Sequence, residues 1–109
     1  MQNILGGIIM NISSNLKAID TIKSEILSEV ANLYRTLADY DEIGEYDSVS
    51  NEIATIIAMD YILARRLGLT YAGIDKKISE LLTIGEENGH ELEIQFSDMS
   101  DLRKFIKSR

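Results

Sequence analysis

Residues 16–38, LKAIDTIKSEILSEVANLYRTLA, decide the fold class. Apolar side chains recur in this stretch at spacings of three and four residues, and they are Leu16, Ile19, Ile22, Ile26, Val30, Leu33 and Leu37. An α-helix has 3.6 residues per turn, so this spacing places all of them on one face. The stretch therefore predicts an amphipathic helix that begins near Asn15, after the capping residues Ser13 and Ser14, and ends near Ala38.

A second helix is predicted after an acidic loop. Residues 39–47, DYDEIGEYD, break the apolar spacing, so they predict the turn of a helix hairpin. We expect Asp47 or Ser48 to cap a helix that ends at Leu67, with Gly68 just beyond it. Apolar residues cover most of the circumference of this helix, and a single chain of this size has few neighbours to surround it. This pattern predicts a homodimer or a homotetramer.

Two shorter helices are predicted in the C-terminal part of the chain. The boundaries that we expect are the N-cap Thr70, a weakening or end at Gly85 and Asn88-Gly89, and the N-cap Ser97 or Asp98 of the last helix. Residues 86–96 between the two helices predict a helix that is interrupted at Asn88-Gly89.

The composition agrees with an all-α fold. The chain has 109 residues, enough for one domain, and it contains no proline, which helix interiors tolerate badly. We expect a bundle of about four helices that homo-oligomerisation completes. Residues 14–109 then form a single domain, and residues 1–13 form a flexible or packed-down leader or, as the alternative, an interfacial anchor. The apolar residues 4–10 of this leader are too few to span a bilayer.

Charge and cysteine content exclude several classes of function. Eighteen acidic and eleven basic residues give a formal net charge of −7, which argues against nucleic acids and anionic membranes as partners. The chain has no cysteine, which excludes disulfides, thiolate zinc sites and cysteine nucleophiles. Its one histidine, His90, makes a Ser-His-Asp triad unfavourable, and we expect it at the surface or as a helix cap. These features are typical of a cytoplasmic protein.

Carboxylates are the remaining side chains that could support catalysis or bind a metal. Glu25 and Glu29 are four residues apart, so both project from the same side of the first helix. Glu52 and Asp60 lie on the second helix, Asp60 among apolar neighbours. Oxygen ligands on facing helices can hold Mg²⁺ or Mn²⁺, so these four residues are candidate metal ligands. The alternatives are that Glu25 and Glu29 are solvated surface residues and that Asp60 forms a structural ion pair with a nearby arginine or a partner's lysine.

An ordered set of motifs resembles a known family. The motifs are SEILSEVANLYRTL at 24–37, ARRLGLTYAGIDKKISELL at 64–82, IGEENGHELE at 84–93 and FSDMSDLRKFI at 96–106. Together they are similar to the MazG-like proteins of the all-α NTP pyrophosphatase superfamily, over residues 14–107. The resemblance implies hydrolysis of nucleoside triphosphates to monophosphate and pyrophosphate, by a dimer or tetramer built around a four-helix bundle. It also implies Mg²⁺ held by E-x-x-E on one helix and E-x-x-D on the next.

The chain departs from the metal motifs of that family. Glu25 can be the first acid, but Ser28 stands three residues later and Glu29 one step beyond. The second motif, counted from Leu67-Gly68, falls on one of two pairs, Asn51 with Ala54 or Glu52 with Thr55. In either case its aspartate is missing. The metal site is therefore rearranged, or the fold persists without the activity.

Two functions are compatible with these observations. The first is a nucleotide pyrophosphohydrolase dependent on Mg²⁺ or Mn²⁺, in which Glu25, Glu29 and Glu52 hold the metal and Lys76 and Lys77 bind phosphate. The second is a non-catalytic helical oligomer that binds a nucleotide or a protein partner. A coiled-coil interaction module with no link to nucleotides would explain the apolar second helix equally well, but it leaves the ordered motifs as coincidence.

Overall fold

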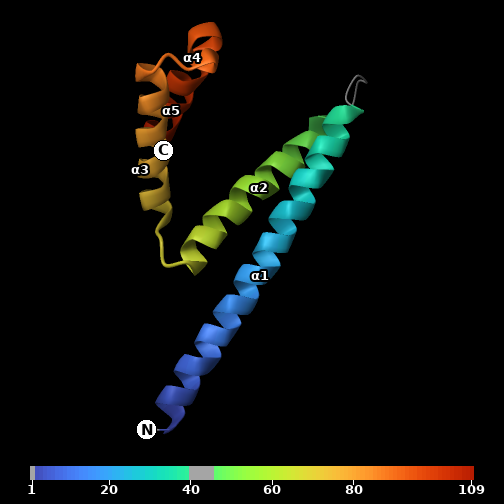
Figure 1. Cartoon of the computed structure of the whole chain (residues 1–109), viewed down its shortest axis with the longest axis vertical. Coiled ribbons are helices and arrows are strands. Elements are labelled where there is room, and N and C mark those ends of the chain that lie inside the picture. The colour runs from blue at the N-terminus through green and yellow to red at the C-terminus, as the bar shows by residue number, and fades with distance from the viewer. Residues whose placement is uncertain (1, 40–45) are drawn as a thin grey trace. The chain divides into compact units, whose positions relative to one another are not determined.

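The computed structural model describes residues 2–39 and 46–109 and, within them, the side chains of residues 12–39 and 47–109. Every regular element in this part of the chain is a helix, which confirms the all-α prediction (Figure 1). The helices are α1 (Gln2–Ala38), α2 (Tyr46–Arg66), α3 (Tyr71–Glu87), α4 (Glu91–Phe96) and α5 (Asp98–Ser108). The described residues form one helix more than the expected bundle of about four, because the chain between α3 and α5 forms the separate short helix α4.

The chain divides into two compact units, Met1–Gly68 and Leu69–Arg109. The first contains α1 and α2, and the second contains α3, α4 and α5. The single domain expected over residues 14–109 depends on how these units associate, and it stays a prediction.

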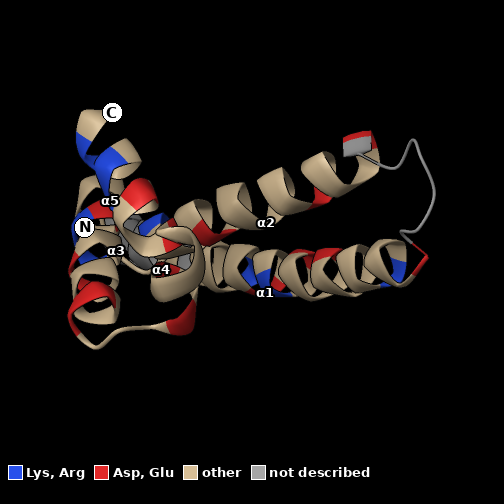
Figure 2. Ribbon diagram, turned by 90° about the horizontal axis from the view of Figure 1, so that it is seen from above, with Lys and Arg blue, Asp and Glu red and all other residues tan. Residues whose placement is uncertain are grey.

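The first unit is an antiparallel hairpin of α1 and α2. The two helices run side by side, with acidic residues along both and basic residues along α1 and at the C-terminal end of α2 (Figure 2). Thr36 bonds to Glu52 near the turn, and Asn15 bonds to Arg66 at the opposite end, which fixes the antiparallel direction. Ile22 on α1 and Ala64 on α2 are buried. Partly buried apolar residues line the seam, namely Ile19, Ile26, Val30 and Leu33 on α1 and Val49, Ile56, Met59 and Leu63 on α2.

The first helix begins earlier than the sequence analysis expected. It starts at Gln2, so Ser13 and Ser14 lie inside α1 and do not cap it, and residues 2–13 continue the helix that the leader was expected to precede. The reason is visible in the sequence, since apolar residues at 4, 8 and 12 keep the helical spacing and no proline interrupts it. The expected end at Ala38 is confirmed. The predicted loop lies mostly at residues 40–45, outside the described residues.

The second unit pairs α3 with α5, and α4 packs on α5. Arg103 bonds to Glu86 with Nε–Oε2 and Nη2–Oε1 distances of 2.6 and 3.0 Å, and Arg109 bonds to Asp75 near the other end of α3. The order of these two pairs shows that α3 and α5 are antiparallel. Ile106 is the buried apolar residue of this unit among the described side chains.

Helix boundaries in the second half mostly match the sequence expectations. Thr70 caps α3 by accepting from the Gly73 amide at 2.9 Å, and Gly68 and Gly89 have positive φ of 89° and 66°, as C-terminal glycines do. The interruption expected at Asn88-Gly89 is present, because α3 ends at Glu87 and α4 starts at Glu91. His90 caps α4 by accepting from Leu92, which confirms its expected role.

One expectation in this half is wrong, and a second is confirmed in position only. Gly85 neither loosens nor ends α3; it lies where α3 approaches α5 closely, and a Cβ built at this position would lie 3.1 Å from Met99 Sδ. Ser97 is the N-cap residue of α5, as one of the two expected, but its side chain makes no cap hydrogen bond. The Glu93 carboxylate from α4 instead accepts from the Ser100 amide and hydroxyl, both at 2.8 Å. Among the described residues, no helix combines the length and apolarity that a membrane span requires.

Candidate functional site

One side of the hairpin carries a row of polar residues on each helix. This polar side consists of Ser24, Glu25, Ser28, Glu29, Asn32 and Thr36 on α1 and of Ser48, Glu52 and Thr55 on α2. Glu25, Glu29, Asn32 and Thr36 follow one another at steps of four, three and four, and Ser48, Glu52 and Thr55 at steps of four and three. Such steps keep each set on one side of its helix. The Thr36–Glu52 hydrogen bond joins the two rows.

The α1 row borders an open depression of about 230 Å³, which Ser24, Glu25, Ser28 and Glu29 line. The two carboxylates that the sequence placed on one side of the helix therefore share one surface feature. Two serine hydroxyls accompany them, and hydroxyls can donate hydrogen bonds to anionic oxygens. The depression thus offers acceptors for a cation and donors for a phosphate within two turns of helix.

A chain of side-chain hydrogen bonds supports Glu29. Asn32 Nδ2 donates to Glu29 Oε1 at 3.4 Å, and Arg35 Nη1 donates to Asn32 Oδ1 at 3.2 Å. The amide of Asn32 therefore links a cation to the glutamate without a direct ion pair. Thr36 Oγ1 lies 2.9 Å from the Asn32 carbonyl and 2.8 Å from Glu52 Oε1, so its single proton serves two acceptors.

Glu52 is a buried carboxylate, with only 9% of its surface exposed. Its Oε1 accepts from Thr36 and from Ser48 Oγ, the latter at 3.0 Å. Among the described residues, no hydrogen-bond partner reaches its buried Oε2. Removing a polar group from water without a partner is costly, so this oxygen can still accept a hydrogen bond or contact a cation.

The remaining candidate residues lie elsewhere on α2 or in the second unit. Asp60 is exposed, and it lies eight residues after Glu52, which is about 80° around the helix at 100° per residue. That rotation takes it away from the polar side. Lys76 and Lys77 lie on α3 in the other unit, where both are exposed and Lys77 Nζ is 3.1 Å from Glu80 Oε2.

The oxygen donors present can be compared with the ligands that a divalent cation requires. Among the described residues, no three Asp, Glu, His or Cys side chains gather as a metal-binding group. Mg²⁺, however, is commonly held by one or two carboxylates together with water and phosphate oxygens. Glu25 and Glu29 at their depression fit that mode, whereas a cage made of protein oxygens alone does not fit.

Sequence reasoning missed the hydroxyl and amide partners in this site. Asn32, Thr36 and Ser48 are not among the candidates, which are all carboxylates and lysines. A signal for them exists, since Asn32 stands three residues after Glu29 and Ser48 stands four before Glu52. The bond between Thr36 and Glu52 joins two helices, and it needs the register of the hairpin to be recognised.

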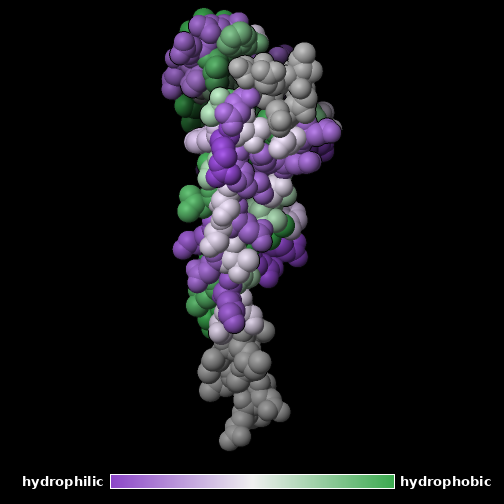
Figure 3. All heavy atoms as spheres, turned by 90° about the vertical axis from the view of Figure 1, so that its right-hand side faces the viewer, coloured by the Kyte–Doolittle hydropathy of each residue, from purple (hydrophilic) through white to green (hydrophobic). Residues whose placement is uncertain are grey.

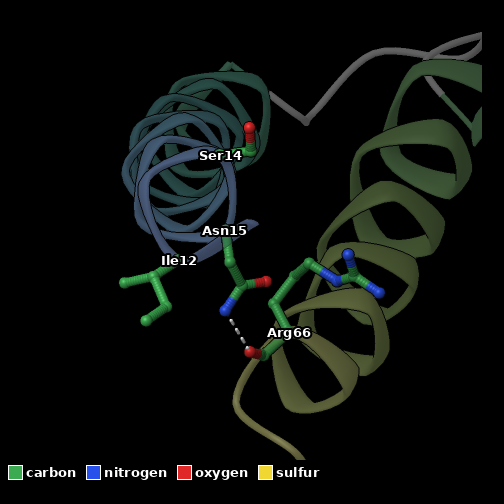
Figure 4. Close-up of a pocket in the computed structure, with 4 residues that line it drawn as sticks. All are labelled: Ile12, Ser14, Asn15 and Arg66. Atoms are coloured by element: carbon green, nitrogen blue, oxygen red, sulfur yellow. Dashed lines mark hydrogen bonds between the residues drawn. The ribbon is translucent and has the colours of Figure 1, made fainter. Parts of the chain in front are cut away.

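A second depression, of about 450 Å³, lies at the far end of the hairpin (Figure 4). Its lining residues are Ile12, Ser14, Asn15 and Arg66. Asn15 Nδ2 donates to the Arg66 carbonyl at 2.8 Å, while the Arg66 guanidinium lies away from this bond (Figure 4). The last carbonyls of a helix have no partner within it, so Asn15 caps the C-terminus of α2. The hydrogen bond gives this depression a structural role, because it links α1 to the C-terminal end of α2.

Comparison with known proteins identifies one family. A family model described as the MazG-like family matches residues 12–99, which include the polar side of the hairpin and most of the second unit. No curated protein and no solved structure matches the chain.

Proposed function

The chain belongs to the MazG-like family, and on that basis we propose that it is a nucleoside triphosphate pyrophosphohydrolase with its site on the polar side of the hairpin. The reaction would be hydrolysis, in which water breaks the bond between the α- and β-phosphates of a nucleoside triphosphate and leaves a monophosphate and pyrophosphate. The observation that carries the proposal is the shared depression of Glu25 and Glu29, which offers two carboxylates with serine hydroxyls beside them. Glu52 on the facing helix adds a buried oxygen that has no hydrogen-bond partner among the described residues.

Glu25 and Glu29 would hold the metal, either Mg²⁺ or Mn²⁺. When bound, the ion neutralises charge on the phosphate oxygens and positions them for displacement. Glu52 would contribute through Oε2, because Oε1 is already engaged by Thr36 and Ser48. Asp60 lies away from the polar side, and Lys76 and Lys77 belong to the other unit, so their assigned roles as ligand and phosphate binders remain predictions.

The other polar residues would orient these groups. Asn32 holds Glu29 by a hydrogen bond, and Arg35 holds Asn32, so the glutamate keeps its place while its second oxygen stays available. The Ser24 and Ser28 hydroxyls can donate to phosphate oxygens that enter the depression. Hydroxyls stand here in place of further acids, so fewer negative charges repel the triphosphate than in a site with four carboxylates.

The test is a pyrophosphate release assay. Purified protein is incubated with Mg²⁺ and, separately, with Mn²⁺ and a panel of canonical and modified NTPs and dNTPs. We expect metal-dependent release that Glu29→Gln reduces at least tenfold, because the substitution removes a charged ligand but keeps the shape. Glu87→Gln on exposed α3 is the matched control and should release pyrophosphate at the wild-type rate. Unchanged turnover in Glu29→Gln would contradict the site assignment.

A second candidate is a non-catalytic helical oligomer that binds a nucleotide or a protein. The observation in its favour is that Ser28 and Thr55 or Ala54 stand where the family motifs have acids. A thermal melt with and without millimolar Mg²⁺ or Mn²⁺ separates the two candidates, because a ligand that binds only the folded state raises the melting temperature. A melt that no metal shifts, together with no pyrophosphate release, supports the second candidate.

A further inference from the structure

The far end of the hairpin, opposite its turn, differs in charge from the rest of the chain. All 18 acidic residues lie within positions 20–60 and 75–101. Residues 2–19 and 61–68, which form the far end, therefore contain no acid. They contain three basic residues, namely Lys17, Arg65 and Arg66. The chain has a formal net charge of −7, but its far end is positive, and a local positive potential attracts anions.

The larger of the two depressions described above lies at this positive end. Three of the residues that line it are polar, Ser14 and Asn15 on α1 and Arg66 on α2. The Ser14 hydroxyl and the Arg66 guanidinium lie on the same side of the hydrogen bond between Asn15 and Arg66 (Figure 4). Hydrophilic and hydrophobic side chains meet just above the grey N-terminal atoms in Figure 3. The volume of about 450 Å³ is within the range of small-molecule sites, which is about 300–1,000 Å³.

The Arg66 side chain is not used to complete its own helix. Basic side chains near a helix C-terminus often bind the last carbonyls, which have no partner within the helix. In α2, the backbone amides of Leu67 and Gly68 donate to carbonyls of the last turn, and Asn15 donates to the Arg66 carbonyl. Arg66 is exposed, and no acceptor among the described residues bonds to its guanidinium. Its N–H donors can therefore bind an anion that enters the depression.

The donors that line the depression match a phosphoryl group. A guanidinium presents its N–H donors as a planar fork that binds two phosphate oxygens at once. The Ser14 hydroxyl can donate to an oxygen, and Asn15 Nδ2 uses one hydrogen for the Arg66 carbonyl and has a second to donate. A carboxylate has two oxygens in one plane, whereas a tetrahedral phosphoryl group directs its oxygens towards donors on both helices. Ile12 lines the same depression and can contact an organic part of the ligand.

This group of donors is separate from the carboxylates of the proposed catalytic site. Asn15 precedes Glu25 by ten residues, which is about 15 Å along α1 at 1.5 Å per residue. A phosphoryl group held by Arg66 is therefore not the one that a metal ion on Glu25 and Glu29 would contact.

We propose that the far end of the hairpin binds a phosphoryl group, with Arg66 as the bidentate donor and Ser14 and Asn15 as the further donors. The phosphoryl group belongs either to a small soluble phosphate or to the headgroup of an anionic lipid, because both present the same oxygens. The binding needs no metal ion, so it does not depend on the proposed hydrolysis.

The first experiment is a titration with inorganic phosphate at constant ionic strength and without metal. Heteronuclear NMR of the backbone amides should show saturable shifts at residues 14, 15 and 66. Arg66→Gln should weaken binding at least tenfold, because it removes the charge and the fork. Ser14→Ala removes one donor and should weaken binding less. Circular dichroism verifies that each variant keeps its helices, so lost binding is not a lost fold.

The second experiment identifies the source of the phosphoryl group. The protein is sedimented with vesicles of phosphatidylcholine alone and with vesicles that also contain phosphatidic acid. Sedimentation with the second kind only, reduced in Arg66→Gln, supports a lipid headgroup as the ligand. Binding of inorganic phosphate without sedimentation on either kind of vesicle supports a soluble phosphate.

The matched control is Lys17→Gln, which removes the same charge from the same end of the hairpin. Lys17 is two residues from Asn15, or about 200° around α1, so its side chain starts on the other side of the helix. This variant should bind phosphate within about twofold of the wild type. An equal loss in Lys17→Gln and Arg66→Gln would show general attraction of anions and overturn the site, and so would a wild type without saturable shifts. Phosphate binding without pyrophosphate release would leave this inference intact and contradict only the catalytic proposal.

Discussion

The hairpin of α1 and α2 and the unit of α3, α4 and α5 hold their helices together by different means. The hairpin relies on an apolar seam and a single buried carboxylate, Glu52, which accepts from hydroxyls. The C-terminal unit relies on two arginine–carboxylate pairs, Arg103 with Glu86 and Arg109 with Asp75. In the hairpin, the ion pair of Lys23 with Asp20 lies within α1.

The two units also differ in whether their carboxylates are engaged by other groups of the same unit. In the C-terminal unit, Glu86, Glu93 and Asp75 are engaged by arginines or by a helix cap of the same unit. On the hairpin, Glu25 and Glu29 border a depression whose lining, among the described residues, holds serines and no arginine or lysine. Glu86, Glu93 and Asp75 are thus engaged within their own unit, whereas Glu25 and Glu29 are the carboxylates to which the proposed function assigns a cation.

The largest effect is expected from the hairpin seam. Ile22 is 7% exposed, and Ile22→Ala removes buried methyl groups and leaves a cavity, so it should lower the free energy of unfolding by about 3 kcal/mol. Urea unfolding followed by circular dichroism measures this change. Ile94→Ala in the C-terminal unit is the control, because Ile94 is 73% exposed and should cost less than about 0.5 kcal/mol. Equal costs for the two would refute the assignment of the seam as the source of hairpin stability.

The next largest loss of stability is expected at Glu52, the buried carboxylate of the hairpin. Glu52→Ala removes the acceptor of the Thr36 and Ser48 hydroxyls and should cost about 1–3 kcal/mol. Glu52→Gln keeps an acceptor for those hydroxyls and removes the buried charge, so it should be clearly more stable than the alanine variant. Thermal melts of the three proteins test this order. An alanine variant as stable as the glutamine variant would show that the hydroxyl bonds contribute little.

A smaller effect is expected at the start of the C-terminal unit. Thr70 accepts from the Gly73 amide, and Thr70→Ala leaves that amide without its cap, at a cost of about 1 kcal/mol. Thr70→Ser keeps the hydroxyl and should retain most of the stability. The slope and midpoint of urea unfolding distinguish the two variants. If both variants lose the same stability, the methyl group and not the cap is responsible.

The smallest effect is expected in the pH dependence of the same unit. The hydrogen bond from Arg103, opposed by desolvation and aided by the charge of the arginine, holds the pKa of Glu86 below its ordinary value of 4.5. The folded state therefore binds fewer protons than the unfolded state near this pH, and the stabilisation is present above pH 4.5 and lost as the pH falls through the lowered pKa. Melting temperatures from pH 7 to pH 3 should fall less steeply in Glu86→Gln than in wild type, with Glu87→Gln as the unchanged control. Parallel curves for all three would rule out this linkage.

Much of the fold could be predicted from local sequence. The apolar spacing of α1, the cap at Thr70, Gly68 after α2 and the interruption at Asn88-Gly89 all depend on neighbours within a few residues, and all are present in the structure. The missed features depend on contacts between elements. Gly85 lies inside α3, where Met99 of α5 leaves little room for a side chain, and no local rule contains that contact.

The candidate site, like the fold, could be predicted only where it depends on residues close together in the sequence. The i, i+4 spacing placed Glu25 and Glu29 together, and the structure agrees. The burial of Glu52 depends on Thr36, sixteen residues away on the other helix, so it needs the hairpin register. The apolar neighbours of Asp60 in the sequence made it a candidate ligand. Its position around the helix, however, determines on which side of the hairpin it lies.

The close approach of Met99 to Gly85 makes the joint between α3 and α5 sensitive to oxidation. A Cβ at position 85 would already lie 3.1 Å from the Met99 sulfur, so the space around that sulfur on the α3 side is filled. Conversion of the thioether to a sulfoxide adds a polar oxygen to this atom and changes its shape. The oxygen would have to point away from α3 or push the helices apart. A hydrogen peroxide treatment would therefore act on the C-terminal unit at one atom, in a chain that has no cysteine to react first.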